Sequence, residues 1–362
     1  MFGRRSLPEA SHRRAVGSAL AAALLFGAST PAAKHLAGDL PAFLLAGLLY
    51  AGSGLGLAAW RLLRPSAEAL PRGADLPWLA GAVLSGGVAG PVLLMLGLAQ
   101  TTAATASLLL NLEGALTALI AWFVFRENFD RRIAAGLTLI LAGGALLTVD
   151  PGAGWGLSPA ALCVAGACLA WAIDNNLTRR VSAGDALAIA AIKGTVAGAV
   201  NLGIAFAMGS AAPSAAQTLA GGLIGLFGYG VSLALFVVAL RELGAARTGA
   251  YFSVAPFAGV VLSMAALGEA PGTTFWVALP LVALGVWLHV TESHAHSHVH
   301  EPMEHAHRHV HDDHHRHAHD FDWNGVEPHT HPHRHERLAH SHPHYPDIHH
   351  RHPHGRAADN AR

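Results

Sequence analysis

Charged side chains are scarce through most of this chain. Only 13% of its 362 residues are Asp, Glu, Lys or Arg, whereas 52% are hydrophobic. Eleven of the acids and seven of the arginines follow Val290, so the first 290 residues hold only 28 charges. A soluble domain of this length carries about twice that charged fraction. The composition therefore excludes an ordinary soluble protein and favours a lipid bilayer as the surroundings of the first 290 residues.

Cysteine and lysine are also nearly absent. Cys163 and Cys168 lie five residues apart on different faces of an apolar stretch, a spacing that matches no metal or redox motif. We expect both to be small buried hydrophobic residues. Nothing resembles a phosphate-binding loop, a catalytic triad or a nucleic-acid platform, so no enzyme, ATP-driven pump or nucleic-acid partner is predicted. The use of two lysines against 21 arginines is typical of a GC-rich bacterial genome, which favours a bacterial inner membrane.

Long apolar runs are what the chain has in abundance. A helix of about 20 apolar residues crosses the ~30 Å hydrocarbon layer. These runs predict an all-α integral membrane protein with ten transmembrane helices. They are Ala15–Ala33, Ala42–Leu63, Trp78–Leu98, Ala103–Phe125, Ile133–Val149, Ala160–Ile173, Ala186–Met208, Leu219–Leu240, Ala250–Leu267 and Phe275–Val290.

The arginines predict the orientation of these helices. Basic residues concentrate in the cytoplasmic loops of membrane proteins. With the N-terminus inside, 14 arginines between Arg4 and Arg247 fall on the cytoplasmic side, and only Lys34 falls outside. Both termini are therefore predicted to be cytoplasmic.

The apolar part of the chain repeats itself. Five residues of the first half, Leu98, Ala103, Ala104, Leu116 and Glu127, recur 142 positions later as Leu240, Ala245, Ala246, Ala258 and Glu269. Earlier in each half, Phe26 and Lys34 align with Trp171 and Arg179 at an offset of 145. Each half holds five predicted helices, an odd number, so the second half must be inverted relative to the first. Inverted repeats are typical of alternating-access transporters. The predicted units are two five-helix repeats, 1–150 and 151–291, and a C-terminal tail, 292–362.

Three blocks of sequence resemble one transporter family. They are LAQTTAATASLLLNLEGALTALIAWFVFRENFDRRIAAGLTLILAGGALLTV at Leu98–Val149, its echo at Leu240–Leu288, and WAIDNNLTRR at Trp171–Arg180. In these blocks the chain resembles the EamA-type members of the drug/metabolite transporter superfamily. The chain departs from the family at Gly114, where a proline is usual and where the second repeat keeps Pro256, and at Asp174, where an aromatic residue is common. The resemblance covers about residues 15 to 291 and implies transport of a small metabolite.

Three charged residues lie deep in the predicted helices. Each such charge costs a few kcal/mol in a bilayer and is therefore a functional candidate. Glu113 lies about 18 Å from the cytoplasmic end of its helix at about 1.5 Å per residue. Asp174 and Lys193 lie at similar depths on neighbouring helices. They either form a structural ion pair, or Lys193 meets an anionic substrate group; likewise Glu113 is either a packing residue or exchanges a proton during transport.

Five further residues are candidates for lining a substrate site: Asn111, Trp171, Asn175, Tyr229 and Tyr251. Polar and aromatic residues in membrane helices more often bond a neighbouring helix, so each has this structural alternative. Asn175, together with Asn176, could instead cap the end of its helix.

Histidine dominates the last 70 residues. Of 26 histidines, 23 lie between His294 and His354, mostly in His-x-His runs, and apolar residues nearly vanish. Such a segment cannot build a core, so the tail is predicted to be disordered. Residues two apart in an extended chain face the same way, so two runs could surround one zinc, nickel, copper or cobalt ion. The predicted ligands are His294, His296, His298, His300, His305, His307, His309, His311, His329, His331, His333, His335, His340, His342 and His344. A pH-responsive tail is the alternative, because protonating all 23 histidines near pH ~6.5 would move its net charge from −4 to +19.

Three functions follow from these observations. The leading prediction is a secondary transporter, in the export direction, of a small metabolite, with a metal-binding cytoplasmic tail and no required cofactor. A divalent transition-metal (Ni, Co or Zn) transporter is the alternative, and a membrane-anchored metal sensor or buffer is the third. The expected partners are the lipid bilayer, the small-molecule substrate and divalent metal ions, and the sequence leaves a homodimer open.

Overall fold

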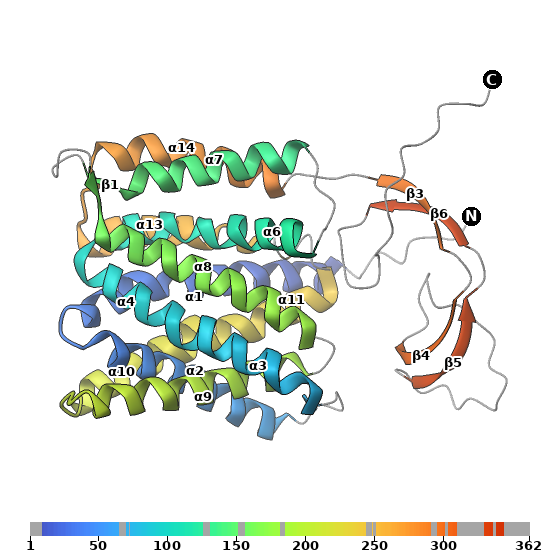
Figure 1. Ribbon diagram of the computed structural model, residues 1–362, viewed down its shortest axis with the longest axis horizontal. Coiled ribbons are helices and arrows are strands. Elements are labelled where there is room, and N and C mark those ends of the chain that lie inside the picture. The colour runs from blue at the N-terminus through green and yellow to red at the C-terminus, as the bar shows by residue number, and fades with distance from the viewer. Residues whose placement is uncertain are drawn as a thin grey trace. The chain divides into compact units, whose positions relative to one another are not determined.

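The computed structural model describes the chain as two compact units, Met1–Glu292 and Ser293–Arg362. The described residues are 9–64, 70–71, 73–125, 131–150, 156–181, 185–243, 248, 251–290, 295–300, 303–309, 329–335 and 338–343. Figure 1 shows long helices lying side by side in the first unit. A single two-residue pairing, β1 (Val149–Asp150) with β2 (Gly156–Leu157), joins two of them.

The predicted apolar runs coincide with helices wherever they are described. The helices are α1 (Glu9–Ala37), α2 (Ala42–Leu63), η1 (Gly73–Asp75), α3 (Leu76–Ala82), η2 (Val83–Ala89), α4 (Gly90–Gln100), α5 (Ala103–Leu109), α6 (Asn111–Phe125), α7 (Arg131–Thr148), α8 (Pro159–Val181), α9 (Ala186–Ala207), α10 (Ala215–Gly225), η4 (Leu226–Val231), α11 (Ser232–Leu243), α13 (Ala255–Leu267) and α14 (Thr273–Val290).

Seven helical stretches of the described part are long and apolar enough to cross a membrane. They are Arg13–Ala37, Ala42–Leu63, Leu76–Gln100, Ala103–Val124, Pro159–Thr178, Leu187–Ala207 and Ala215–Ala239. Three shorter apolar helices are Arg132–Thr148, Ala255–Leu267 and Thr273–Leu288. The first unit is thus that of an α-helical membrane protein, and the count of ten spans stays a prediction for the three shorter helices.

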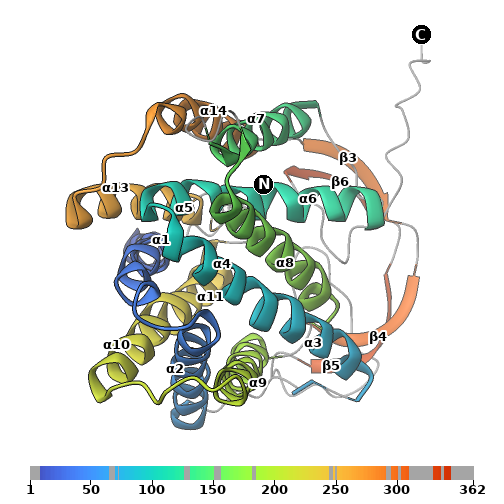
Figure 2. The same cartoon turned by 60° about the vertical axis from the view of Figure 1, so that its left-hand side comes forward.

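Glycines bring two helices that are far apart in the sequence into contact. Helices α7 and α14 lie against each other along one edge of the bundle (Figures 1 and 2). A Cβ atom on Gly143 would meet Val282 at 2.6 Å, and one on Gly285 would meet Ile140 at 2.8 Å. The two contacts are reciprocal, because each partner's number differs by 142 from its counterpart's.

Two stretches contain a π-helical turn at corresponding places. The turn η2 lies between α3 and α4, and the turn η4 lies between α10 and α11. Such turns insert an extra residue into a helix and displace backbone carbonyls from their usual partners. Gly86 in η2 packs directly against Asp174, and Gly228 in η4 packs against Ser29, so each turn receives a side chain from a distant helix.

The junction between α4 and α5 is held from both sides. The Lys34 ammonium group donates to the carbonyl oxygens of Leu98 at 2.5 Å and Thr101 at 2.8 Å, where α4 ends. The carboxylate of Glu269 accepts from the backbone N–H groups of Ala103 at 2.7 Å and Ala104 at 2.8 Å, where α5 begins. Both charges complement the helix ends that they contact, since carbonyls carry partial negative charge and N–H groups partial positive charge.

Four segments of the tail are strands in the structure, whereas the sequence predicts disorder. These are β3 (Ala295–His300), β4 (Met303–His309), β5 (His329–His335) and β6 (Leu338–Pro343). Strand β3 pairs with β6 and β4 with β5, both antiparallel. Backbone pairing requires no apolar core, and a His-x-His pattern has the period of two that a strand has. Of the predicted ligands, His294, His311 and His344 lie outside the described residues.

Candidate polar site in the helical unit

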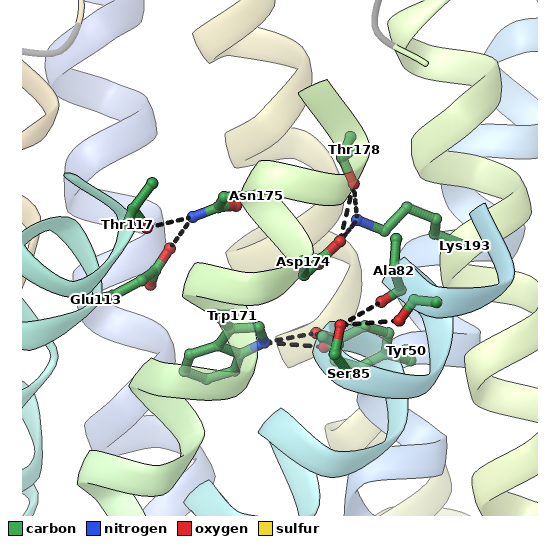
Figure 3. A network of polar contacts seen from close by, with 12 residues as sticks. Tyr50, Ala82, Ser85, Glu113, Thr117, Trp171, Asp174, Asn175, Thr178 and Lys193 are labelled. Carbon is green, nitrogen blue, oxygen red and sulfur yellow. Dashed lines mark hydrogen bonds and ion pairs between the residues drawn. The ribbon is translucent and has the colours of Figure 1, made fainter. Parts of the chain in front are cut away.

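Helix α8 supplies most of the polar side chains of the candidate site. Trp171, Asp174, Asn175 and Thr178 are spaced three or four residues apart, so they line one side of the helix. Figure 3 shows them directed toward neighbouring helices: Asp174 toward α9, Trp171 toward Tyr50, and Asn175 toward α6.

Asp174 and Lys193 form an ion pair. The Lys193 ammonium nitrogen lies 2.5 Å from Asp174 Oδ1 and donates to the Thr178 hydroxyl at 2.9 Å. The Thr178 hydroxyl in turn donates to Asp174 Oδ1 at 2.8 Å. The two charged side chains are only 17% and 10% exposed, so each charge is held by the other rather than by water. This is the structural alternative considered for the pair, and it leaves the charge of Lys193 neutralised.

The π-helical turn η2 provides carbonyl acceptors beside this ion pair. The Gly86 carbonyl accepts from the Tyr50 hydroxyl at 2.7 Å and from the Trp171 indole N–H at 2.9 Å. The adjacent Gly87 carbonyl accepts from the Asn201 amide at 2.8 Å. Because a Cβ atom on Gly86 would overlap Asp174, only glycine allows the carboxylate to approach the turn this closely.

Glu113 lies where a helix is interrupted. Helix α5 ends at Leu109 and α6 begins at Asn111, so Glu113 falls in the first turn of α6. Its carboxylate accepts from the Asn175 amide at 2.9 Å. The same amide donates to the Thr117 hydroxyl at 3.3 Å, and Asn175 is exposed. Glu113 is thus a helix-embedded carboxylate whose partner here is a neutral amide.

The capping role considered for Asn175 and Asn176 is wrong. Helix α8 continues to Val181, beyond both residues. The Asn176 amide donates to Ala172 in its own helix at 2.8 Å and to the Thr117 carbonyl at 3.2 Å. Both asparagines therefore connect α8 to α6.

The remaining predicted residues are distributed over the bundle. The Asn111 amide is buried and donates to the Leu108 carbonyl at 2.9 Å, across the break between α5 and α6. The ring of Tyr229 lies 5.8 Å from those of both Phe26 and Tyr50. Tyr251 packs elsewhere, against the cluster of Ala15, Ala19 and Ala239.

Four polar residues of this site were not predicted from the sequence: Tyr50, Thr117, Thr178 and Asn201. Tyr50 gave a usable signal, since it is one of only four tyrosines and falls in the middle of an apolar run. Thr117 and Thr178 gave none, because threonine in a membrane helix commonly bonds its own backbone. Metal binding finds no support here: where side chains are described, no group of three His, Cys, Asp or Glu could hold an ion.

Known proteins resemble this chain at the level of sequence and of fold. The sequence profile described as the EamA-like transporter family matches residues 13–149 and again residues 158–291. An "Uncharacterized transporter" of Methanothermobacter thermautotrophicus is 30% identical over 188 residues, which cover 50% of this chain and 55% of the relative. The match thus spans about half of that relative's length.

A shorter relative and a solved crystal structure also resemble this chain. A "Probable 4-amino-4-deoxy-L-arabinose-phosphoundecaprenol flippase subunit ArnE" of Pseudomonas paraeruginosa is 41% identical over 111 residues, covering 29% of this chain and 94% of the relative. One solved crystal structure superimposes with a TM-score of 0.55 at 22% identity, covering 76% of this chain and 95% of that one. It shows a shared fold.

Proposed function

Because this chain belongs to the EamA-like transporter family, we propose that it is a secondary active transporter that exports a small organic metabolite. In this proposal the solute binds beside Glu113, Asn175 and Thr117. The observation that carries the proposal is a carboxylate inside an interrupted helix, bonded to an exposed amide of a second helix.

The proposed architecture is ten transmembrane helices in two inverted five-helix repeats, residues 1–150 and 151–291. Three observations support it: the family profile matches twice, the contacts of Gly143 and Gly285 are reciprocal, and the turns η2 and η4 recur at corresponding places. Two inverted halves can expose one central site to either face of the membrane in turn. The placement of both termini in the cytoplasm stays a prediction from the arginine distribution.

Glu113 is the charge proposed to act in each cycle. The charge of Asp174 is offset by Lys193, whereas the described partner of Glu113 is the neutral amide of Asn175. A carboxylate at membrane depth is costly when ionised, so it binds a proton more readily than one in water. A proton and a solute that compete for Glu113 would couple export to proton entry. Lys193 is not assigned a substrate group, because its ammonium group is already bonded to Asp174 and Thr178.

The interruption between α5 and α6 supports this role. Broken helices are typical of transporter binding sites, where the freed backbone groups line the route of the solute. Here the break falls at Leu110, three residues before Glu113. The aromatic rings of Tyr50, Tyr229 and Phe26 lie in a neighbouring cluster and provide apolar surface for an organic solute.

The C-terminal unit has an accessory role in this proposal. Its described residues form strands, and in this proposal its histidines bind divalent metal ions. A metal-transporting route is not put forward, because the side chains described in the helices form no candidate metal site.

A comparison of released metabolites tests the transport proposal. Cells that make the wild-type protein are compared with cells that make Glu113→Gln and with cells that lack the protein. We expect at least one small organic solute to accumulate in the medium of the wild-type culture and to fall to the background level with Glu113→Gln, because glutamine cannot exchange the proton.

Asp39→Asn is the matched control for this experiment. It makes the same carboxylate-to-amide change at an exposed turn between α1 and α2, and release should stay at the wild-type level. Equal membrane abundance of all variants must be verified by immunoblot. If the Glu113→Gln variant released the solute at the wild-type level, Glu113 would be a packing residue. The transport proposal would then lose the observation on which it rests.

A further inference from the structure

The tail strands share a single register. Ala295 lies opposite Pro343 in the first pair of strands, and Met303 lies opposite His335 in the second. The numbers of two paired residues have the same sum in both pairs of strands, so the register is the same in the two pairs. Strands β3–β6 thus form two antiparallel pairs in the same register, which we together call the histidine ribbon.

Histidine stands opposite histidine at five positions of this ribbon, whereas His300 is opposite Leu338 and His335 is opposite Met303. In the β3 and β6 pair, His296 is opposite His342 and His298 is opposite His340. The β4 and β5 pair adds three more: His305 opposite His333, His307 opposite His331 and His309 opposite His329. Within each strand the histidines are two residues apart, so those of one strand pair share a face.

This register creates a recurring set of four imidazole-bearing positions. Directly opposite residues of an antiparallel pair have Cβ atoms about 4.5–5.5 Å apart, and successive residues on one face of a strand are about 7 Å apart. Two adjacent cross-strand pairs thus place four histidines at the corners of a small rectangle. Four nitrogen ligands at about 2.0–2.1 Å are what a tetrahedral zinc site requires.

We propose that the histidine ribbon holds divalent transition-metal ions between its strands, each ion bound by two adjacent cross-strand histidine pairs. One site consists of His296, His298, His340 and His342, and a second uses two of the three pairs of β4 and β5. Imidazole nitrogen suits zinc, nickel, copper(II) and cobalt, with copper favoured by intrinsic affinity. Binding requires neutral imidazole, so the ions should be released as the pH falls through ~6.5.

Such ions would also stabilise the ribbon itself. A two-stranded ribbon alone is marginally stable in water, and this tail has too few apolar residues to add a core. An ion bound by β3 and β6 ties residues more than 40 positions apart, and its binding free energy becomes folding free energy. The same composition that predicts disorder thus permits an ordered ribbon once metal is present.

This inference deepens the accessory role proposed above for the tail and is independent of the transport proposal. Its test is a count of tightly bound zinc. The full-length protein in detergent is freed of metal with a chelator and dialysed against buffered free zinc at pH 7.5. Four variants are compared: His296→Ala with His298→Ala, His340→Ala with His342→Ala, all four together, and His315→Ala with His317→Ala.

We expect the numbers of zinc ions lost in the two double variants not to add up in the quadruple variant. Each of the first two variants removes one zinc ion, and the quadruple variant removes the same single ion, because both pairs bind one shared site. The control, which removes two histidines between β4 and β5, removes none. Replacing zinc with cobalt(II) should give the intense visible absorption of a tetrahedral site in the wild type, weakened in the first two variants.

Two results would overturn the inference in distinguishable ways. If the quadruple variant loses twice as many ions as each double variant, or if the control loses as many, the histidines do not act as cross-strand pairs. If the wild-type protein binds no zinc, the accessory metal role is lost as well. Neither result bears on Glu113.

Discussion

The turns η2 and η4 have the same backbone but different surroundings. In both turns, a glycine packs against a side chain of a helix distant in the sequence. Gly86 contacts Asp174, and Gly228 contacts Ser29. Asp174 is bonded to Lys193, and the Gly86 carbonyl accepts from two further side chains. Ser29 instead donates to the Phe26 carbonyl in its own helix at 2.6 Å.

This difference distinguishes contacts that pack the helices from contacts that involve charged side chains. Close helix contact through a glycine is needed on both sides, because packing between membrane helices depends on small residues. Among the described contacts, the glycine of η2 meets a charged side chain, Asp174, whereas that of η4 meets the neutral Ser29. The ion pair between Asp174 and Lys193 and the carboxylate of Glu113 therefore distinguish the surroundings of η2 from those of η4.

Breaking the ion pair should produce the largest difference between the two turns. Asp174→Asn or Lys193→Gln alone leaves a largely buried charge without its partner, which costs about 3 kcal/mol or more. The double variant should be less destabilised than either single variant, because no charge remains unpaired. Ser29→Ala, at the corresponding place beside η4, removes one local hydrogen bond and should cost about 1 kcal/mol. Thermal unfolding in detergent measures all four.

The double-mutant cycle decides whether the pair acts as a unit. A coupling energy near zero between Asp174→Asn and Lys193→Gln would show that the two side chains contribute independently. An equally large effect of Ser29→Ala would remove the asymmetry between η2 and η4.

Adding one methyl group to each turn should give a smaller difference. Gly86→Ala places a Cβ atom where Asp174 lies, and Gly228→Ala places one where Ser29 lies. Overpacking of this kind costs about 1–3 kcal/mol. We expect Gly86→Ala to lower the unfolding temperature more, because moving Asp174 also strains its bond to Lys193. Equal shifts for the two variants would mean that the ion pair adapts without cost.

Much of the fold follows from the amino-acid sequence, because a bilayer restricts the choice of structure. Apolar runs such as Ala42–Leu63 must be helical in lipid, since every backbone group has to be bonded internally. The pairing of Asp174 with Lys193 also follows, because two charges at similar depth have few other partners. The interruption before Glu113 does not follow, since no proline marks it and Gly114 stands where the family usually has one.

Two features could not be predicted from the sequence. One is the polar site beside η2, and the other is the pairing of the strands in the tail. A π-helical turn has no composition of its own, so the acceptor role of Gly86 and the contribution of Tyr50 depend on tertiary packing. The disorder expected for the tail rested on its lack of a core. Backbone pairing depends on register instead, and the register places His296 opposite His342.

Access to the proposed site from both faces of the membrane is the most direct test of the account. Thr117→Cys, in a protein with Cys163 and Cys168 replaced by alanine, places a thiol beside the Glu113 and Asn175 contact. A membrane-impermeant thiol reagent is applied to right-side-out and to inside-out vesicles. The account predicts labelling in both, whereas Ser263→Cys, fully buried in α13, should be labelled in neither. Labelling of Thr117→Cys from one face alone, or from neither, would contradict alternating access to this site.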